Sequence, residues 1–330
     1  MTRNAINDRI RGVKTKQGLC KPKQKPTITE RKPKMNMMDK IAGLTFGCEL
    51  EYVGISQRHA AKVVAKTVGG EWYYEGAHLN NYVVRMPDGR KWQIVSDASV
   101  GRQSGRTGCE TVTPVLKWAD MDMLQNVVRE LRKARAQADF TCGLHIHVGA
   151  QSLTAKQIQN LAKSWYMGEK IFVEGCGTKA ARLAQWTRPL ETPFVLAMLK
   201  NPKPTMDTLG EAYYGGPIAD HRWRHYDRAR YRTLNLHNLW NGGKGTVEFR
   251  LFEATTHAGE IKANVTFALS MVAKATGLAR VCAKVTKYEC KGGARDMKLM
   301  FHYFGWNGDD FKTARWHFLK RAKEAAAVRH

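Results

Sequence analysis

Residues 46–54, FGCELEYVG, place two acidic side chains inside a segment that otherwise suits a buried strand. In a strand, residues two apart lie on the same face, so Glu49 and Glu51 point to one spot while apolar side chains flank them. Two carboxylates this close repel each other, and burying them costs free energy unless a positive charge compensates. The segment therefore predicts a sheet whose polar face holds something positively charged.

Further strands and helices follow along the chain. We expect a hairpin around the Pro-Asp-Gly turn at 87–89, and we expect residues 175–220, rich in glycine, proline and small residues, to be irregular. The order of the elements predicts an α+β fold around a mainly antiparallel sheet. The chain has no glycine-rich nucleotide motif of the Rossmann or P-loop type. The other predicted strands are 108–116, 143–149 and 245–255, and the predicted helices are 57–68, 119–138, 154–172 and 260–285, with a basic helix near the end.

The 330-residue chain carries a net charge of +25, and this charge is unevenly spread. Residues 1–38 hold 11 Lys and Arg against two acidic residues and lack apolar periodicity, so we expect a disordered basic arm. One interpretation is a solvated tail. The other is an arm that holds a polyanion, such as nucleic acid, through its phosphates.

Composition and cysteine usage narrow the class of protein. A hydrophobic content of 43% suits a globular protein with a core. No apolar run reaches the ~20 residues needed to span a membrane, and the N-terminus lacks the apolar stretch of a secretory signal. The seven cysteines are scattered without CxxC spacing, which indicates reduced thiols. These features predict a cytoplasmic protein with no membrane partner.

Two more predicted strands repeat the polar pattern of period two. His145 and His147 share one face of GLHIHVG, and Glu248 and Arg250 share one face of TVEFRLF, with apolar residues on the opposite faces. If these strands are neighbours, their polar faces form one concave surface of carboxylates, imidazoles and an arginine. Two further carboxylates stand close to predicted strands, Glu110 in GCETVTP and Asp97 at the end of WQIVSDAS.

Carboxylates with few neutral ligands favour hard divalent cations, chiefly Mg²⁺ or Mn²⁺. Such cations would neutralise Glu49 and Glu51, and Mg²⁺ commonly completes its shell with phosphate oxygens. Because Arg250 beside such a site suits phosphate, the set predicts ATP-dependent phosphoryl chemistry. Four other interpretations stay open: a solvated acidic face, two ordinary core or surface histidines, a cross-strand salt bridge, and a cupin-like zinc or iron site of His145, His147 and Glu248.

Residues 221–232, HRWRHYDRARYR, hold five arginines interleaved with Trp and Tyr, and they run directly into a predicted site strand. We interpret the segment as a clamp on ATP phosphates or on a carboxylate substrate. A solvated basic helix and a stacking surface for nucleic acid are the alternatives.

Six motifs occur in a fixed order: FGCELEY, SDASV, CETVTPVL, CGLHIHVG, RYRTLNL and GTVEFRLFEAT. Over roughly residues 43 to 280 they resemble the amidoligases, which belong to the glutamine synthetase and glutamate–cysteine ligase superfamily of carboxylate–amine ligases. The resemblance implies a glutamine-synthetase-like core, a curved and mainly antiparallel sheet with helices packed on one face. It also implies ATP-driven ligation with two or three Mg²⁺ or Mn²⁺ ions, in which a carboxylate is phosphorylated and an amine then displaces phosphate to give an amide.

The resemblance also implies a metal ligand set. By similarity, Glu49 and Glu51 each bind a different metal, and Glu110 looks like the ligand shared with Glu51. The ligands that the resemblance places beside Glu49 are His147, together with His145, and Glu248.

The remaining implied residues concern ATP and catalysis. Arg250 looks like the residue that stabilises the transferred phosphoryl group. Asp97 falls in the family's D-x-S element, and Arg230 with Asn235 in its arginine–asparagine element. We expect Arg230, Arg232, Asn235 and Arg250 to bind the cofactor ATP, and Arg250, Glu248 and Asp97 to be catalytic.

These expectations describe an ATP-dependent carboxylate–amine ligase with three parts: the arm at 1–38, a catalytic domain at 39–285 and a basic helical extension at 286–330. Its partners would be a carboxylate and an amine, with nucleic acid or another macromolecule as a further substrate. A nucleic-acid-binding protein with an inactive ligase-like core is the first alternative, and the cupin-like enzyme is the second. ATP turnover with a free amine separates the ligase from both, and zinc or iron content identifies the cupin-like enzyme.

Overall fold

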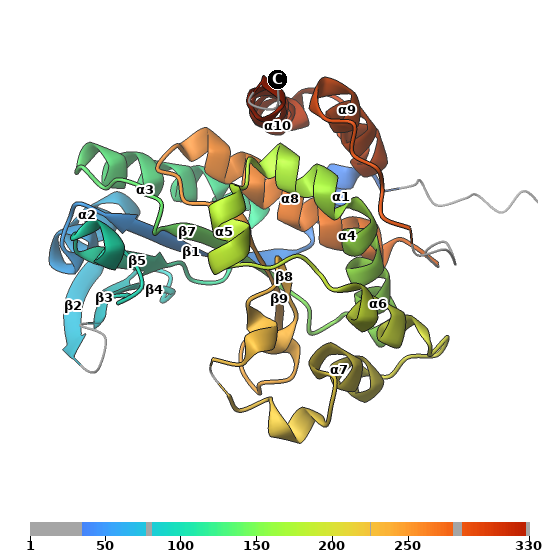
Figure 1. The fold of residues 1–330 in the computed structure, drawn as a ribbon. Coiled ribbons are helices and arrows are strands. Elements are labelled where there is room, and N and C mark those ends of the chain that lie inside the picture. The colour runs from blue at the N-terminus through green and yellow to red at the C-terminus, as the bar shows by residue number, and fades with distance from the viewer. Residues whose placement is uncertain (1–34, 77–80, 225, 280–285, 328–330) are drawn as a thin grey trace, which may run out of the picture. The chain divides into compact units, whose positions relative to one another are not determined.

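The computed structural model describes residues 35–76, 81–224, 226–279 and 286–327 (Figure 1). Residues 1–34 of the predicted arm and residues 280–285 of the last predicted helix before the extension lie outside the described residues. Within the described part, no helix has both the length and the apolar character needed to cross a membrane.

A nine-stranded sheet organises the described chain, and its neighbouring strands pair in antiparallel fashion. The order is β2-β3-β4-β5-β1-β7-β9-β8, and the short β6 pairs with β1. The predicted hairpin around residues 87–89 is confirmed by the pairing of β3 with β4. The strands are β1 (Thr45–Val53), β2 (Glu71–Gly76), β3 (Asn81–Arg85), β4 (Lys91–Val95), β5 (Gly108–Val112), β6 (Leu116–Lys117), β7 (Gly143–Gly149), β8 (Leu234–Asn235) and β9 (Thr246–Glu253).

Helices pack on one face of this sheet. Figure 1 shows α3, α4 and α8 along that face, with α9 and α10 outside them, and α10 contacts both α4 and α8. The prediction of an α+β fold with a mainly antiparallel sheet and helices on one face is confirmed. The helices are α1 (Met37–Ala42), α2 (Gln57–Val68), α3 (Met121–Lys133), α4 (Ala155–Cys176), α5 (Ala180–Gln185), α6 (Thr192–Leu199), α7 (Met206–Tyr214), α8 (Ala258–Thr276), α9 (Gly293–Phe304) and α10 (Lys312–Ala327).

The core lies between the sheet and the helices because the strands alternate apolar and polar residues. The alternate residues Ile146 of β7 and Phe249 of β9 are fully buried. Trp165 of α4 packs against Phe249, with ring centroids 5.2 Å apart, and against Phe267 of α8, at 5.9 Å. Along β7 and β9, the residues that alternate with these buried ones therefore point to the opposite, open face of the sheet.

The prediction that residues 175–220 are irregular is wrong, because the structure forms α5, α6 and α7 there. Some of the proline and glycine residues that suggested irregular chain mark the ends of α6 and α7. Pro193 occupies the first turn of α6, while α7 is capped by Thr205 and ends at Gly215 in a left-handed conformation with φ of 74°. Each helix also buries apolar side chains, such as Phe194 in α6.

Candidate metal and substrate site

Adjacent strands bring together the polar side chains that the sequence singled out. Strand β1 lies between β5 and β7, and β9 pairs with the other side of β7. Glu51 lies opposite Glu110 across the β1–β5 pair, and Glu49 lies opposite His145 across the β1–β7 pair. Opposed residues of antiparallel strands present their side chains on the same face, so these four groups share the open face of the sheet.

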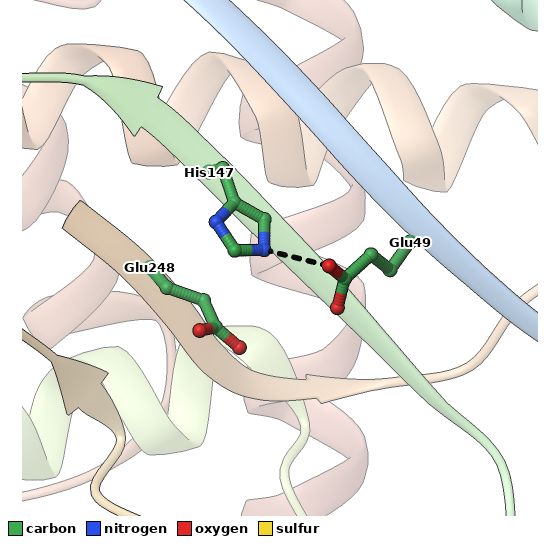
Figure 2. A group of neighbouring side chains, drawn as sticks. All are labelled: Glu49, His147 and Glu248. Atoms are coloured by element: carbon green, nitrogen blue, oxygen red, sulfur yellow. Dashed lines mark ion pairs between the residues drawn. The ribbon is translucent and has the colours of Figure 1, made fainter. Parts of the chain in front are cut away.

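Glu49, His147 and Glu248 form a first group of potential metal ligands, called the Glu49 group below. Figure 2 shows them converging from β1, β7 and β9, and one ligand atom of each lies within 4.8 Å of the other two. His147 Nε2 is 3.1 Å from Glu49 Oε1, while His147 Nδ1 is 3.0 Å from the hydroxyl of Thr246. The second contact holds the imidazole ring so that Nε2 faces the two carboxylates.

Glu51, Asp97 and Glu110 form a second group, the Glu51 group, whose ligand atoms also lie within 4.8 Å of one another. Asp97 comes from the loop after β4, where its Oδ1 accepts hydrogen bonds from the amide (2.7 Å) and the hydroxyl (2.6 Å) of Ser99. The amide of Gly143 donates to Glu51 Oε2 at 2.5 Å. Within the described chain, no lysine or arginine nitrogen lies within ion-pair distance of these three carboxylates.

His145 lies between the two groups. Its Nδ1 is 3.1 Å from Glu49 Oε2 and 3.8 Å from Glu248 Oε1, and its Nε2 is 3.7 Å from Glu51 Oε1. The side chain is buried, and Arg182 approaches it with an Nη2–Nε2 distance of 3.5 Å. His145 therefore contacts carboxylates of both groups and spaces them apart.

The two groups differ in electrostatic state. Burial, together with the charges of Glu49, Glu51 and Asp97, raises the pKa of Glu110 well above its usual value. Burial also raises the pKa of Glu51. Burial opposes ionisation of Glu49 too, but His147, His145 and Lys244 outweigh it and hold the Glu49 pKa well below normal. The Glu51 group is thus short of positive charge.

Glu248 is held by hydrogen bonds from neighbouring side chains. Arg250 Nη1 donates to its Oε1 at 2.5 Å, and Asn235 Nδ2 donates to its Oε2 at 2.7 Å. Asn235 in turn accepts a hydrogen bond from the Tyr213 hydroxyl at 3.1 Å. Burial opposes ionisation, but the guanidinium of Arg250, and then His147, lower the pKa of Glu248 to about 2.

Both groups open into one cavity of about 940 Å³. Of the residues predicted to bind the cofactor, Arg230 and Arg250 lie on its wall. Arg232 does not line the cavity, because its Nη1 donates to the backbone carbonyl of Tyr213 at 2.9 Å and its guanidinium lies over the Phe194 ring. Asn235 does not line the cavity either, and its side chain donates a hydrogen bond to Glu248 instead. The predicted residues on the cavity wall are Glu49, Glu51, Asp97, Glu110, His145, His147, Arg230, Glu248 and Arg250.

Several basic residues of the cavity, among them Arg182 and Lys244, were not singled out from the sequence. Arg182 of α5 is buried and donates to the backbone carbonyls of Cys142 (3.3 Å) and Arg250 (3.2 Å). Lys244 sits in a glycine-rich loop before β9, with its Nζ 2.8 Å from Glu49 Oε1. No spacing signal marks either one, because Arg182 stands in a segment that looked irregular and Lys244 in a turn.

The residues present fit divalent cations. Each group offers three donors, mostly carboxylate oxygens, which suit Mg²⁺ or Mn²⁺. Two observations made within the described residues point the same way: no lysine or arginine forms an ion pair with the carboxylates of the Glu51 group, and the buried Nε2 of His147 has no well-oriented hydrogen bond. The cupin-like set of His145, His147 and Glu248 is not among the three-donor groups that the described residues form.

The comparisons with known proteins identify the family. This is an α+β protein with a cavity on the open face of an antiparallel sheet, lined by clustered carboxylates and by arginine and lysine side chains. A family model described as "Putative amidoligase enzyme" matches residues 42–272, and the chain belongs to that family. The resemblance to amidoligases inferred from the sequence motifs is therefore confirmed.

Among solved structures, one match is the crystal structure of the complex between prokaryotic ubiquitin-like protein Pup and its ligase PafA. The identity is 11%, the TM-score is 0.34, and the alignment covers 89% of this chain. The chain spans 66% of the length of that structure's chain. A comparison with curated proteins finds no match.

Proposed function

We propose that this protein is an ATP-dependent ligase that joins a carboxylate to an amine. The observation that carries the proposal is the pair of three-donor groups, the Glu49 group and the Glu51 group, side by side in one cavity with Arg250. Adjacent cation sites with an arginine suit the handling of a nucleotide's phosphates. Membership of the amidoligase family supports the same class of reaction.

The proposed reaction has two steps. An oxygen of the substrate carboxylate attacks the γ-phosphorus of ATP, the bond to the β-phosphate oxygen breaks, and ADP leaves an acyl phosphate behind. The amine nitrogen then attacks the acyl carbon, the carbon–oxygen bond to phosphate breaks, and the nitrogen loses a proton as the amide forms. Bound divalent cations would neutralise phosphate oxygens during the first step.

The chain's own residues would prepare this reaction. Glu248 fixes the orientation of the Arg250 guanidinium through the 2.5 Å hydrogen bond, and the buried Arg250 Nε has no hydrogen-bond partner in the described residues. Arg250 is thus a fixed donor in the cavity, suited to the charge that develops on a transferred phosphoryl group. Arg230 and Arg222 line the wall nearby and would hold phosphate or carboxylate groups.

A nucleic-acid-linked substrate is favoured by the outer wall of the cavity. Trp223 and Tyr226 line it with 72% and 75% of their surfaces exposed, and the Arg222 guanidinium lies 4.5 Å from the Trp223 ring centroid. Exposed aromatic and arginine side chains of this kind stack with bases. The basic arm adds a second, independent source of phosphate affinity. A nucleic-acid-binding protein with an inactive core would share these features and differ in lacking ATP turnover.

The test is ATP turnover with a trapped intermediate. The purified protein is incubated with ATP, Mg²⁺ or Mn²⁺, a panel of carboxylates and hydroxylamine, which stands in for the amine and converts an acyl phosphate into a hydroxamate. We expect ADP and hydroxamate to form in equal amounts, and a Glu248→Gln variant to form neither. ADP release that does not respond to carboxylate, or no turnover with any carboxylate tried, would contradict the proposal.

A further inference from the structure

A second cavity, of about 550 Å³, lies on the helical side of the sheet, between α3, the start of α8 and the start of α10. None of the residues of the Glu49 and Glu51 groups lines it. We call it the helical cavity. The inference rests on three basic residues of its lining, on the first two residues of α8, and on Trp316 and His317.

The lining of the helical cavity is basic. Arg129 and Arg132 enter from α3 and Lys312 from α10, and no acidic residue belongs to the lining formed by the described residues. Arg129 donates to the side-chain oxygen of Asn126, and neither Arg132 nor Lys312 makes an ion pair in the described part of the chain. Three cations from two helices therefore surround one hollow without a carboxylate to balance them.

The 19-residue helix α8 begins at this cavity. Ala258 and Gly259, its first two residues, line the cavity, and their N–H groups have no hydrogen-bond acceptor among the described residues. The start of a helix carries a partial positive charge and free N–H donors, which favour an anion. A Cβ at Gly259 would lie 2.7 Å from His317 Nε2, so glycine here lets the imidazole approach the helix start.

His317 is the second, independent indication of a ligand. Its residue is only 4% exposed, it lines the cavity, and its buried Nδ1 has no hydrogen-bond partner in the described residues. The nearest acidic atom, Glu260 Oε1, is 3.9 Å away, and the other oxygen of Glu260 accepts a hydrogen bond from Thr255. A buried ring nitrogen without a hydrogen bond is costly unless something completes its hydrogen bonding.

We propose that the helical cavity binds a small phosphate-bearing anion, separate from the nucleotide of the proposed ligase reaction. Phosphate oxygens would accept from the free N–H groups of α8 and from Arg132 and Lys312 at the same time. Trp316, 55% exposed on the cavity wall, offers a ring on which a nucleotide base can stack. The shared chemistry is the phosphate group, and its source is inorganic pyrophosphate or a nucleotide.

The test measures pyrophosphate binding to the full-length protein by titration calorimetry, in phosphate-free buffer stripped of divalent cations. The site variant is Arg132→Gln/Lys312→Gln, and the control is Lys133→Gln/Lys323→Gln. The control changes two exposed lysines on the same two helices, α3 and α10, that do not line the cavity, so both variants lose the same net charge. We expect the site variant to bind roughly tenfold more weakly or worse, because it lacks two charge-assisted hydrogen bonds, and the control to bind as wild type.

Titration with ATP distinguishes a nucleotide from inorganic pyrophosphate as the source of the phosphate group. If ATP binds more tightly than pyrophosphate and Trp316→Ala weakens only ATP, by roughly fivefold or more, the ligand is a nucleotide. If pyrophosphate and ATP bind alike and Trp316→Ala changes neither, the ligand is the inorganic anion. Equal losses in the site and control variants would overturn the proposal, because binding would then reflect net charge alone, and so would the absence of saturable binding. None of these outcomes depends on ligase activity.

Discussion

Glu110 is held among like charges, and this makes it the residue whose replacement is easiest to interpret. Burial raises the pKa of Glu110, and the negative charges of Glu49, Glu51 and Asp97 raise it further. A carboxylate whose pKa is higher in the folded than in the unfolded protein binds more protons when folded. Its contribution to stability is therefore present at low pH and is lost as the pH rises through the folded-state pKa.

The first prediction follows from that sign. Without divalent cations, the free energy of unfolding of wild type should fall between pH 5 and pH 8, and Glu110→Gln should reduce the fall, because glutamine cannot ionise. With Mn²⁺ at about 100 times its dissociation constant, wild type should gain ~2.7 kcal/mol and the variant much less. Chemical denaturation under each condition measures this. Glu71→Gln, at an exposed position of β2, is the control, and an equal Mn²⁺ effect in both variants would contradict Glu110 as a ligand.

The second prediction concerns Arg250. Lysine keeps the charge but loses the planar fork that Glu248 orients, so Arg250→Lys should lower kcat by roughly 10²-fold, the scale seen when one preorganised donor is removed. The KM for ATP should change little, because the interaction forms mainly in the transition state. Steady-state kinetics measures both constants. Arg232→Lys is the matched control, since Arg232 does not line the cavity and its replacement should leave kcat near wild type. A wild-type kcat for Arg250→Lys would reject the role.

At the scale of elements, helix α5 matters because it brings Arg182 over β7. The Arg182 guanidinium lies against the Cα of Gly143, where an added Cβ would collide with Nη2. Gly143 also donates its amide to Glu51. Gly143, the first residue of β7, thus contacts both Glu51 and Arg182 of α5.

The third prediction is that Gly143→Ala destabilises the protein by roughly 1–3 kcal/mol, the usual cost of overpacking a filled site. It should also weaken Mn²⁺ binding, because Glu51 loses a well-placed donor or Arg182 moves. The control is Gly47→Ala in β1, where the new Cβ would meet Thr113 Oγ1 at an ordinary 3.6 Å. Urea denaturation and metal titration compare the two. Equal stability of both variants would contradict this prediction, because it would show that the Arg182 side chain moves aside without lowering the free energy of unfolding.

The strands of the site could be predicted from sequence because alternation of period two is a local signal. Glu49 with Glu51, and Glu248 with Arg250, lie on the predicted face, since one residue of slip would bury charges in the core. The structure is needed where the signal is not local. Arg232 follows the same spacing as Arg230 but turns behind the cavity wall to reach Tyr213, and that hydrogen bond depends on α7, a helix that looked like irregular chain.

At the scale of the whole molecule, positive charge is shared between the arm and the rest. Residues 1–34 contain all 11 Lys and Arg of the predicted arm, and removing them leaves a net charge of +16 out of +25. The described residues belong to a separate unit, Met35–His330, which contains both cavities. Within the described chain, the interactions that hold the Glu49 group and the Glu51 group therefore do not involve the arm.

The last prediction is that deletion of residues 1–34 leaves the melting temperature and Mn²⁺ binding unchanged while weakening binding to nucleic acid. For every phosphate that the protein no longer neutralises, the log–log salt slope should fall by roughly 0.9 for duplex DNA and roughly 0.7 for a single strand. Binding at several salt concentrations measures the slope for wild type, for the deletion, and for a full-length control in which the arm's Lys and Arg are replaced by Gln. If charge is the cause, the control matches the deletion, because it keeps the chain and loses the cations. If all three proteins give the same affinity and slope, the arm is a solvated tail, and the case for a nucleic-acid-linked substrate then rests on Trp223 and Tyr226 at the cavity wall alone.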